Sequence, residues 1–387
     1  MKKYKIEKYH WRNVFFFSLS PVFAIVGLVL YFVHFGSPPW QTWLLFGIYI
    51  CITSLSITAG YHRALSHKSY DIALLPKLFF LLFGAASYQS SALWWSAEHR
   101  LHHRYEDTDK DPYGINKGFW YAHIGWLLEK REDASCDVVK DLAKDKWVMW
   151  QHKFIWVVSF FSGFILPTLI AFTWGDPLGG LLFAGLTRMV INHHATFCIN
   201  SLCHFVGKQS FSDEITAKDS WISALITFGE GYHNFHHKFQ YDYRNAIRAY
   251  QWDPTKWLIN IMAWCGLAKN LKKVDEKKIL EASIQADEVY FLDRVKAYSH
   301  TVHERAEKML HESKCRLCQA QEKLVTLKQE YAELKRNYKE LKEKQFLHAK
   351  VKLQEMKKEM KLAQKEFKEA LLHWRDLVNA TPVVLES

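Results

Sequence analysis

The sequence predicts an all-α membrane protein with four transmembrane helices, a cytoplasmic cap rich in histidine and a C-terminal helical extension. Three observations lead to this class: long apolar runs in the first 200 residues, tight histidine clusters near them, and a tail dominated by Lys and Glu from about residue 269. The mean hydropathy of −0.18 resembles that of a soluble protein because it averages two unlike halves. The 7 Cys, without a secretory signal, do not indicate a disulfide framework.

Four apolar runs have the length that a bilayer core of about 30 Å requires, roughly 17–25 helical residues. They cover residues 14–35, 43–59, 154–174 and 178–198. The first and third runs are long and uncharged, which argues against buried helices of a large soluble core. The fourth run is less pure, because it contains Arg188, Asn192, His193 and His194. Residues 74–86 are too short to span, so we expect them to lie at the interface or to pack against the bundle.

The connections within each pair of runs are tight hairpins, residues 36–42 and Gly175-Asp176-Pro177. Four spans then place residues 1–13, 60–153 and 199–387 on one side of the membrane. These segments are rich in Lys and Arg, which is typical of cytoplasmic segments near spans, so both termini are expected to be cytoplasmic. Topology and attraction to anionic lipid then explain the net charge of +11, and nucleic-acid binding is not expected.

Nine of the 20 His gather in short segments on the predicted cytoplasmic side: His62, His67, His99, His102, His103, His204, His233, His236 and His237. Residues at i, i+3 and i+4 share a helix face, so each of the two His-x-x-His-His motifs is expected to aim three imidazoles at one point. Neutral imidazole binds iron, copper, zinc and nickel, and nine imidazoles exceed the needs of one ion. Two metal ions are therefore predicted, with solvated surface histidines as the alternative.

Other motifs narrow the choice of metal. The sequence contains no His-Glu-x-x-His, which disfavours a zinc protease, and no obvious Glu-x-x-His bundle pattern. A site rich in nitrogen ligands beside a membrane favours redox iron acting on O2, because zinc and magnesium are redox-inert and supply no oxidant for an unactivated C–H bond. Asn200, four residues before His204, is expected to hold a metal-bound water.

The histidine clusters resemble the three histidine boxes of the integral-membrane fatty acyl desaturases, specifically of the stearoyl-CoA Δ9-desaturase type. Neighbouring segments are similar too: Gly60-Tyr61-His62-Arg63, Glu98-His99-Arg100, Asp109-x-Asp111-Pro112, Gly125-Trp126-Leu127-Leu128 and Gly229-Glu230-Gly231-Tyr232-His233-Asn234. The resemblance covers about residues 8–275. It implies a membrane desaturase domain in residues 1–275, followed by an unrelated, charged helical coiled-coil extension in residues 276–387.

The resemblance implies two iron ions, with O2 as cosubstrate, at the positions of the nine histidines and Asn200. The family's bent acyl tunnel implies three residues at the bend: Gln89, Trp95 and Thr196. Phe197 replaces an adjacent tunnel Trp. The family's CoA contacts imply three residues at the head group: Asn13, Lys130 and Arg131. Ala97-Glu98 stands where CoA-using members carry Arg-Asp, which leaves acyl-ACP or an intact lipid as alternatives to acyl-CoA.

The implied activity is insertion of a cis double bond, at Δ9, into a long-chain saturated acyl thioester. O2 becomes water in this reaction, which requires two external electrons. The sequence contains no Gly-x-Gly-x-x-Gly loop and no b-type cytochrome motif. A separate donor, such as a small b-type cytochrome, a ferredoxin or a similar reductase, is therefore expected to dock on the basic face. The closed end of the tunnel is expected in residues 43–59, where Phe46 or Ile50 sets the chain length.

Two other functions fit the same residues. A histidine-box hydroxylase of acyl chains or alkanes needs the same metals and O2, and an alcohol product distinguishes it. A membrane-anchored coiled-coil scaffold with a dead catalytic half is the second alternative, against which the complete set of ligands argues. The expected membrane is the endoplasmic reticulum or a bacterial inner membrane.

Further polar residues near the motifs are expected to support the site. His193 and His194 are expected to be structural or to line the site. The remaining candidates are expected to orient metal-bound imidazoles, since such rings usually donate their second N–H to a carboxylate or carbonyl. These candidates are His123, Glu230 and the acidic run Asp107, Asp109 and Asp111.

The tail carries two apolar seams with heptad-like spacing. Their residues are Leu324, Leu327, Tyr331, Leu334, Tyr338 and Leu341, and then Leu353, Met356, Met360, Ala363, Phe367, Ala370, Trp374 and Leu377. The break over residues 342–352 predicts one long helix or a helical hairpin, which either packs on itself or mediates homodimerisation or partner docking. His311, Cys315 and Cys318 share one helix face, where free thiols are favoured over a zinc site.

Overall fold

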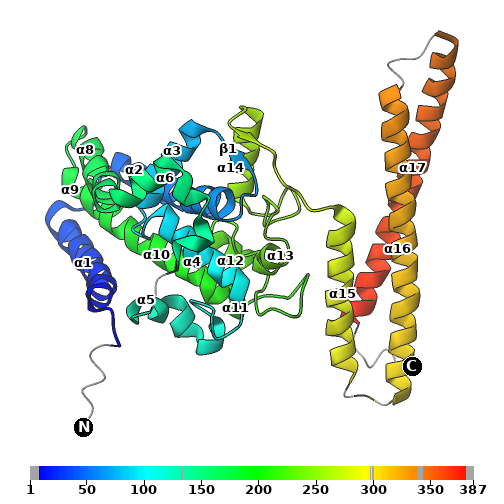
Figure 1. The fold of residues 1–387 in the computed structure, drawn as a ribbon, viewed down its shortest axis with the longest axis horizontal. Helices are drawn as coiled ribbons and strands as arrows, with labels where there is room; N and C mark the ends of the chain where they lie inside the picture. The colour runs from blue at the N-terminus through cyan, green and yellow to red at the C-terminus, as the bar shows by residue number, and fades with distance from the viewer. Residues whose placement is uncertain (1–7, 132–133, 297, 299, 338–342, 381–387) are drawn as a thin grey trace. The chain divides into compact units, whose positions relative to one another are not determined.

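The computed structural model describes residues 8–131, 134–296, 298, 300–337 and 343–380 (Figure 1). The chain divides into two compact units, Met1–Val274 and Asp275–Ser387. Helices dominate the described part of both units, as the sequence predicts. The first unit also contains a two-stranded antiparallel sheet, in which β1 (Asp71–Ile72) pairs with β2 (Ala268–Lys269) so that Asp71 faces Lys269.

Three helices of the described chain are long and apolar enough to cross a membrane. The first is α1 (Trp11–Phe35). The second is α2 (Trp40–Leu55), which continues as the π-helix η1 (Ser56–Ser66). The third joins α7 (Ile155–Phe160), the π-helix η6 (Phe161–Ile165) and α8 (Leu166–Phe172). These helices match three of the four predicted spans, and the protein is an integral membrane protein.

The fourth predicted span, residues 178–198, is helical in the structure but is not one of those three helices. It is built from α9 (Pro177–Gly179), the π-helix η7 (Gly180–Thr187) and α10 (Arg188–Asn200). Three of its polar side chains are buried inside the unit: Arg188, Asn192 and His193. A fourth crossing of the membrane stays a prediction.

Shorter helices complete the first unit. The α-helices are α3 (Leu74–Ala85), α4 (Ala92–Tyr105), α5 (Trp126–Leu128), α6 (Lys146–Lys153), α11 (Leu202–Phe205), α12 (Trp221–Ile226), α13 (His233–Lys238) and α14 (Pro254–Trp264). One further π-helix is η3 (Tyr121–Gly125), and the 3-10 helices are η2 (Ile115–Lys117), η4 (Cys136–Val139) and η5 (Leu142–Lys144). The segment predicted to be interfacial or packed, residues 74–86, forms α3 and packs closely on η1. A Cβ at Gly60 would collide with Phe80, and one at Gly84 would collide with Tyr61.

The second unit consists of α15 (Glu276–Val295), α16 (His300–Asn337) and α17 (Glu343–Asn379). Figure 1 shows α16 and α17 as an antiparallel hairpin. Its core includes Leu310 and Leu317 of α16, and Ala370, Trp374 and Leu377 of α17. Of the predicted seam residues, Tyr338 and Leu341 lie outside the described residues. The tail is thus a hairpin that packs on itself within one chain, whereas a coiled coil between chains stays a prediction.

Arg188 ties three helical segments of the first unit together. Its side chain is fully buried, and its guanidinium donates to three backbone carbonyls: Ala86 O at 2.6 Å, Gly163 O at 3.0 Å and Ala184 O at 3.0 Å. These carbonyls belong to the end of α3, to η6 and to η7. A buried cation with several charge-assisted hydrogen bonds stabilises the packing only while its carbonyl partners stay in place.

Replacing Arg188 by Met removes these donors and leaves buried carbonyls without partners. We therefore expect the free energy of unfolding in detergent to fall by about 2–5 kcal/mol. Thermal or denaturant unfolding of the purified chain measures this change. Arg248→Met is the matched control, because Arg248 is exposed and should change stability by less than about 0.5 kcal/mol. Equal stability of the Arg188 variant and the parent would refute the role of this side chain.

Candidate metal centre

Four short stretches of the first unit carry the clustered histidines. The helix α4 begins where the Ser91 hydroxyl accepts a hydrogen bond from the Trp94 amide at 3.2 Å, which caps its first turn. The helix α13 is only 6 residues long, and its three histidines are buried. His62 lies in η1 with His67 directly after it, and His204 lies in α11.

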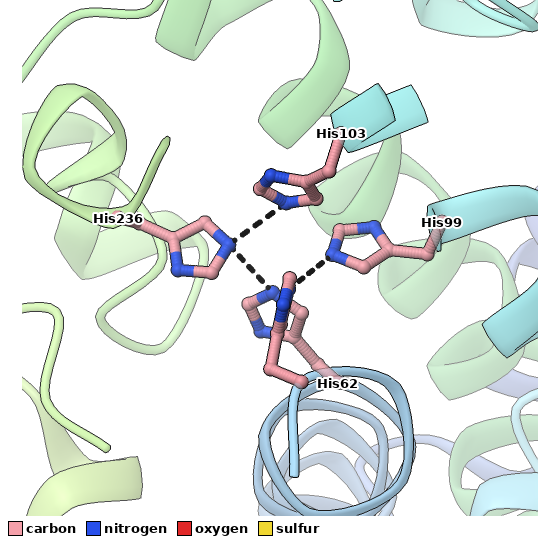
Figure 2. Close-up of side chains that lie close together, drawn as sticks. His62, His99, His103 and His236 are labelled. Carbon is pink, nitrogen blue, oxygen red and sulfur yellow. Dashed lines mark hydrogen bonds between the residues drawn. The ribbon is translucent and has the colours of Figure 1, made fainter. Parts of the chain in front are cut away.

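Five imidazoles converge on one point and form the first cluster: His62, His67, His99, His103 and His236. Figure 2 shows four of these rings, His62, His99, His103 and His236, pointing toward one another. The Nε2 atom of His236 lies 3.0 Å from that of His62 and 3.1 Å from that of His103. Ligand atoms of all five lie within 4.8 Å of one another. This spacing is close to that of nitrogen ligands around an ion with bonds of about 2.0–2.1 Å.

Four imidazoles form the second cluster: His102, His204, His233 and His237. The Nε2 atoms of His233 and His237 lie 3.0 Å apart. The two clusters adjoin, because the rings of His103 and His237 stack with centroids 4.2 Å apart. Among the described residues, three or more His, Cys, Asp or Glu side chains come close enough to share a metal ion only in these two clusters.

Each His-x-x-His-His motif serves both clusters, so the expectation that its three rings meet at one point is wrong. In α4, His99 and His103 join the first cluster and His102 joins the second. In α13 the same division places His236 in the first cluster and His233 and His237 in the second. The reason is the helical advance of about 100° per residue. Position i+4 lies about 40° from position i, whereas i+3 lies about 60° to the other side and faces the neighbouring cluster.

His62 and His67 reach the same cluster because η1 is a π-helix. In an α-helix, residues five apart point about 140° away from each other. The π-helix instead bonds the amide of residue i+5 to the carbonyl of residue i, and the His67 amide donates to the His62 carbonyl at 3.1 Å. The wider turn brings both rings to one side, with centroids 4.8 Å apart.

Acidic side chains behind the rings determine which nitrogen faces the centre. Two contacts do this: His62 Nδ1 to Glu230 at 2.9 Å and His102 Nδ1 to Asp111 at 2.9 Å. His237 Nδ1 also lies 2.7 Å from Glu106, without the geometry of a hydrogen bond. Two hydroxyl contacts act in the same way: His99 Nδ1 to Tyr113 at 3.3 Å and His204 Nδ1 to Thr216 at 2.8 Å. Thr216 in turn donates to Asp107 at 2.6 Å. Such outer contacts fix the tautomer and the orientation of a ligand ring.

Sequence reasoning proposed three of these acidic residues and missed the rest. Glu230, Asp107 and Asp111 lie behind the rings, whereas Asp109 is exposed. Glu106, next to the predicted acidic run, could have been found from that neighbourhood. Tyr113 and Thr216 carry no local signal in the sequence, because only the folded chain brings them to the rings.

The geometry of the donors fits a pair of metal ions. With an Nδ1–H directed outward, the Nε2 atom presents a lone pair to the centre. Two such lone pairs about 3 Å apart repel each other unless a proton or a cation lies between them. The His67 and His99 Nε2 atoms, 2.8 Å apart, illustrate this arrangement. Nitrogen ligands of this kind suit divalent first-row transition metals.

Burial lowers the pKa of seven of the nine imidazoles below its usual value, which favours the neutral form that metal binding requires. Burial and neighbouring histidines lower the pKa of His99 and His103 well below its usual value. The same causes lower the pKa of His204 to about 3. Burial raises the pKa of Glu230, but the electrostatic attraction of Arg63 and the hydrogen bonds from His62 and Arg63 outweigh it and lower that pKa to about 2. The centre thus combines neutral donors with an anion behind them.

A cavity of about 710 Å³ adjoins both clusters, and Asn200 is one of the residues that line it. The predicted bend residues form one hydrogen-bonded chain in the cavity wall. Trp95 Nε1 donates to Gln89 Oε1 at 3.3 Å, and Gln89 Nε2 donates to Thr196 Oγ1 at 2.9 Å. The Trp95 ring also stacks on His99 of the first cluster, with centroids 4.9 Å apart. The structure therefore brings together the residues predicted at the bend and the metal clusters. Phe197 lines the cavity too.

The residues predicted at the head group separate in the structure. Asn13 and Arg131 line the cavity, whereas Lys130 is exposed and does not. Asn13 donates its amide to the Leu127 carbonyl at 2.8 Å. Arg131 forms an ion pair with Glu98 at 2.7 Å. This carboxylate, from the Ala97-Glu98 pair that differs from the family pattern, partly neutralises the charge of Arg131.

Phe46 and Ile50 line neither this cavity nor a smaller one beyond the bend. Phe46 packs instead against Phe183, with ring centroids 6.2 Å apart. Their role in chain-length selection stays a prediction.

Other singled-out histidines lie outside the clusters. His123 Nδ1 contacts the Ser201 hydroxyl at 2.9 Å, and its Nε2 contacts His194 Nδ1 at 3.1 Å. His193 is buried against the Tyr88 carbonyl at 3.3 Å. In α16, His311 and the free Cys315 and Cys318 do not come close enough together to form a group of three metal-binding side chains among the described residues.

Comparison with known proteins places these features in a family. Residues 38–255, more than half of the chain, match the family model described as "Fatty acid desaturase". Acyl-CoA desaturase 1 of Saccharomyces cerevisiae is 47% identical over 244 residues, which cover 62% of this chain and 48% of the relative. The probable acyl-CoA desaturase of Schizosaccharomyces pombe is 43% identical over 291 residues, 74% of this chain and 60% of the relative.

Stearoyl-CoA desaturase 5 of Bos taurus is 34% identical over 281 residues, 70% of this chain and 82% of the relative. The matched region thus spans about half of the length of the Saccharomyces relative, and most of the bovine one. From the family model, these identities and the paired histidine clusters, it follows that the chain belongs to the fatty acid desaturase family.

Proposed function

We propose that this chain is an O2-dependent acyl-CoA desaturase that inserts a cis double bond, at Δ9, into a long-chain saturated acyl thioester. One observation carries the proposal: both histidine clusters adjoin the cavity of about 710 Å³, beside the hydrogen-bonded Gln89, Trp95 and Thr196. The relatives are named acyl-CoA and stearoyl-CoA desaturases, which agrees with this reaction and substrate class.

We propose that two iron ions occupy the clusters, held by the nine histidines and, through water, by Asn200. Inward-facing neutral nitrogens support a transition metal, and attack on an unactivated C–H bond requires a redox-active one. When bound, an iron pair would supply the redox chemistry for this reaction, in which the saturated chain loses two hydrogens while O2, two electrons and two protons are taken up and two water molecules form.

The protein's own side chains select which hydrogens leave. A saturated acyl chain has no polar handle near its middle, so its position is set by the shape of the cavity and by the distance from the head group. Gln89, Trp95 and Thr196 bend the chain beside the first cluster. Glu230 and Asp111 hold the outward Nδ1–H of their histidines, which keeps each Nε2 directed at the metal.

Asn13, Lys130 and Arg131 are the proposed contacts for the CoA head group. Asn13 and Arg131 line the cavity, which supports them, and exposed Lys130 supplies positive charge outside it. Because Arg131 is paired with Glu98, a CoA phosphate has to compete with that carboxylate. We propose acyl-CoA as the carrier of the acyl chain. Faster turnover of acyl-ACP or of an intact lipid would instead identify that molecule as the carrier.

The membrane arrangement that we propose has four spans, with both termini and the histidines on the cytoplasmic side. A separate electron donor docks on that basic face, because two electrons have to reach the iron pair for each double bond. The proposed division is a desaturase domain in residues 1–275 and a helical extension in residues 276–387. The extension is proposed to pair with a second copy or a partner through its coiled-coil seams.

The product decides between desaturation and hydroxylation. Expressed in a desaturase-deficient host, the parent chain should yield cis-unsaturated acyl chains, whose double bond is located by mass spectrometry. His102→Ala, which removes one of the four rings of the second cluster, should lower this product more than about 100-fold. His194→Ala, at an exposed ring outside the clusters, is the control and should retain it. An alcohol in place of the alkene would identify a hydroxylase.

Metal analysis tests the clusters without reference to activity. The purified parent chain should contain about two iron ions, because each cluster supplies enough ligands for one. His204→Ala should lower this content to about one, whereas His311→Ala in the extension should leave it unchanged. Atomic emission on the purified chains gives the counts. Zinc at both clusters, or a parent chain that binds no metal, would contradict the proposal and favour a scaffold.

A further inference from the structure

The turn that joins α3 to α4 holds two residues in a backbone conformation that side chains rarely adopt. Tyr88 has a φ of 54° and Ser90 a φ of 71°, both in the left-handed region. Glycine enters this region freely, whereas a bulky residue there stores strain that the surrounding structure has to maintain. Gln89, which lies between them, is one of the three proposed bend residues. The strain therefore lies where the acyl chain is expected to turn.

One face of α10 holds this turn at two successive residues. His193 Nε2 donates to the Tyr88 carbonyl oxygen at 3.3 Å. Because a carbonyl only accepts, this contact assigns the ring proton of His193 to Nε2. Three residues further along the helix, Thr196 Oγ1 accepts from Gln89 Nε2 at 2.9 Å. Residues three apart share a helix face, so a single face holds both the main chain of the turn and the side chain that the turn presents.

The His193 ring is packed in the orientation that this hydrogen bond requires. It is only 2% exposed, and the Phe197 ring stacks on it with centroids 5.8 Å apart while Phe17 meets it edge-on at 5.3 Å. A buried N–H without an acceptor costs free energy, so the ring favours the turn conformation that keeps the Tyr88 carbonyl within reach. His193 lines the large cavity together with Tyr88, yet it belongs to neither metal cluster.

We propose that His193 is a positioning residue: by holding the Tyr88 carbonyl it keeps the strained turn in place and Gln89 on Thr196, which limits the acyl chain to one register beside the metal clusters. The proposal rests on the proposed desaturase function and deepens it. Without the imidazole donor the turn relaxes toward ordinary φ values, Gln89 moves, and the chain slides by a carbon or more. Because the register decides which hydrogens leave, the position of the double bond reports on His193.

Replacing His193 by Leu tests this role, because Leu fills the apolar site but donates no hydrogen bond. In a desaturase-deficient host, mass spectrometry locates the double bond in each product. The ratio of products unsaturated at neighbouring positions to the product at the parent's position should rise about tenfold, which is the effect of losing one buried hydrogen bond. His193→Gln places an amide N–H near the position of Nε2 and should restore the parent's ratio.

His194→Leu is the matched control, since this neighbouring ring of α10 is exposed and contacts His123 instead, and it should leave the ratio unchanged. A purely structural role of His193 predicts less product at an unchanged position and no rescue by Gln, and that result overturns the positioning role while the desaturase function stands. If His193→Leu does not accumulate in the membrane, His193→Asn, whose shorter amide reaches only the position of Nδ1, replaces it. Failure of both to accumulate assigns the ring to folding and also overturns the proposal. A parent that forms no unsaturated product overturns both the positioning role and the desaturase function.

Discussion

The first unit depends on one arrangement: imidazoles whose Nε2 atoms face each other across gaps of about 3 Å. Without a cation between them, the lone pairs on these atoms repel, so the arrangement persists only if the surrounding protein holds each ring in place. The protein does this with carboxyl and hydroxyl groups placed behind several of the rings. Arg63 illustrates the construction, because it follows His62 in the chain and contacts both Glu230 and Asp253, at 2.9 and 3.0 Å. One buried cation thereby joins η1 to the segment that leads into α13.

The same arrangement explains why the cavity lies where it does. A pair of redox ions acts only on bonds within a few ångströms, and a saturated chain offers no group by which to hold its middle. Under the proposed function, the cavity carries the acyl chain past the ions and bends it there. Trp95 stacks on His99 and hydrogen-bonds to Gln89, so one side chain serves the metal cluster and the wall of the cavity together.

Much of the fold and of the site could be predicted from the sequence, since both depend on local patterns. Apolar runs of spanning length predict α1, the long helix that ends in η1, and the helix from Ile155 to Phe172. The nine histidines stand in short motifs that predict two metal sites. The prediction failed where ring direction mattered: His102 faces the second cluster, because a helix turns about 100° per residue and adjacent histidines diverge.

The sequence by itself determined which chemistry is available: the number of imidazoles, their spacing, the apolar spans and the amphipathic pattern of α16 and α17. Only the tertiary structure decided how these parts divide and meet. It sorted five rings into one cluster and four into the other, and it placed Glu106, Tyr113 and Thr216 behind them. The physical reason is that spacing along a helix sets a direction, whereas the partner found in that direction depends on contacts between segments far apart in the chain.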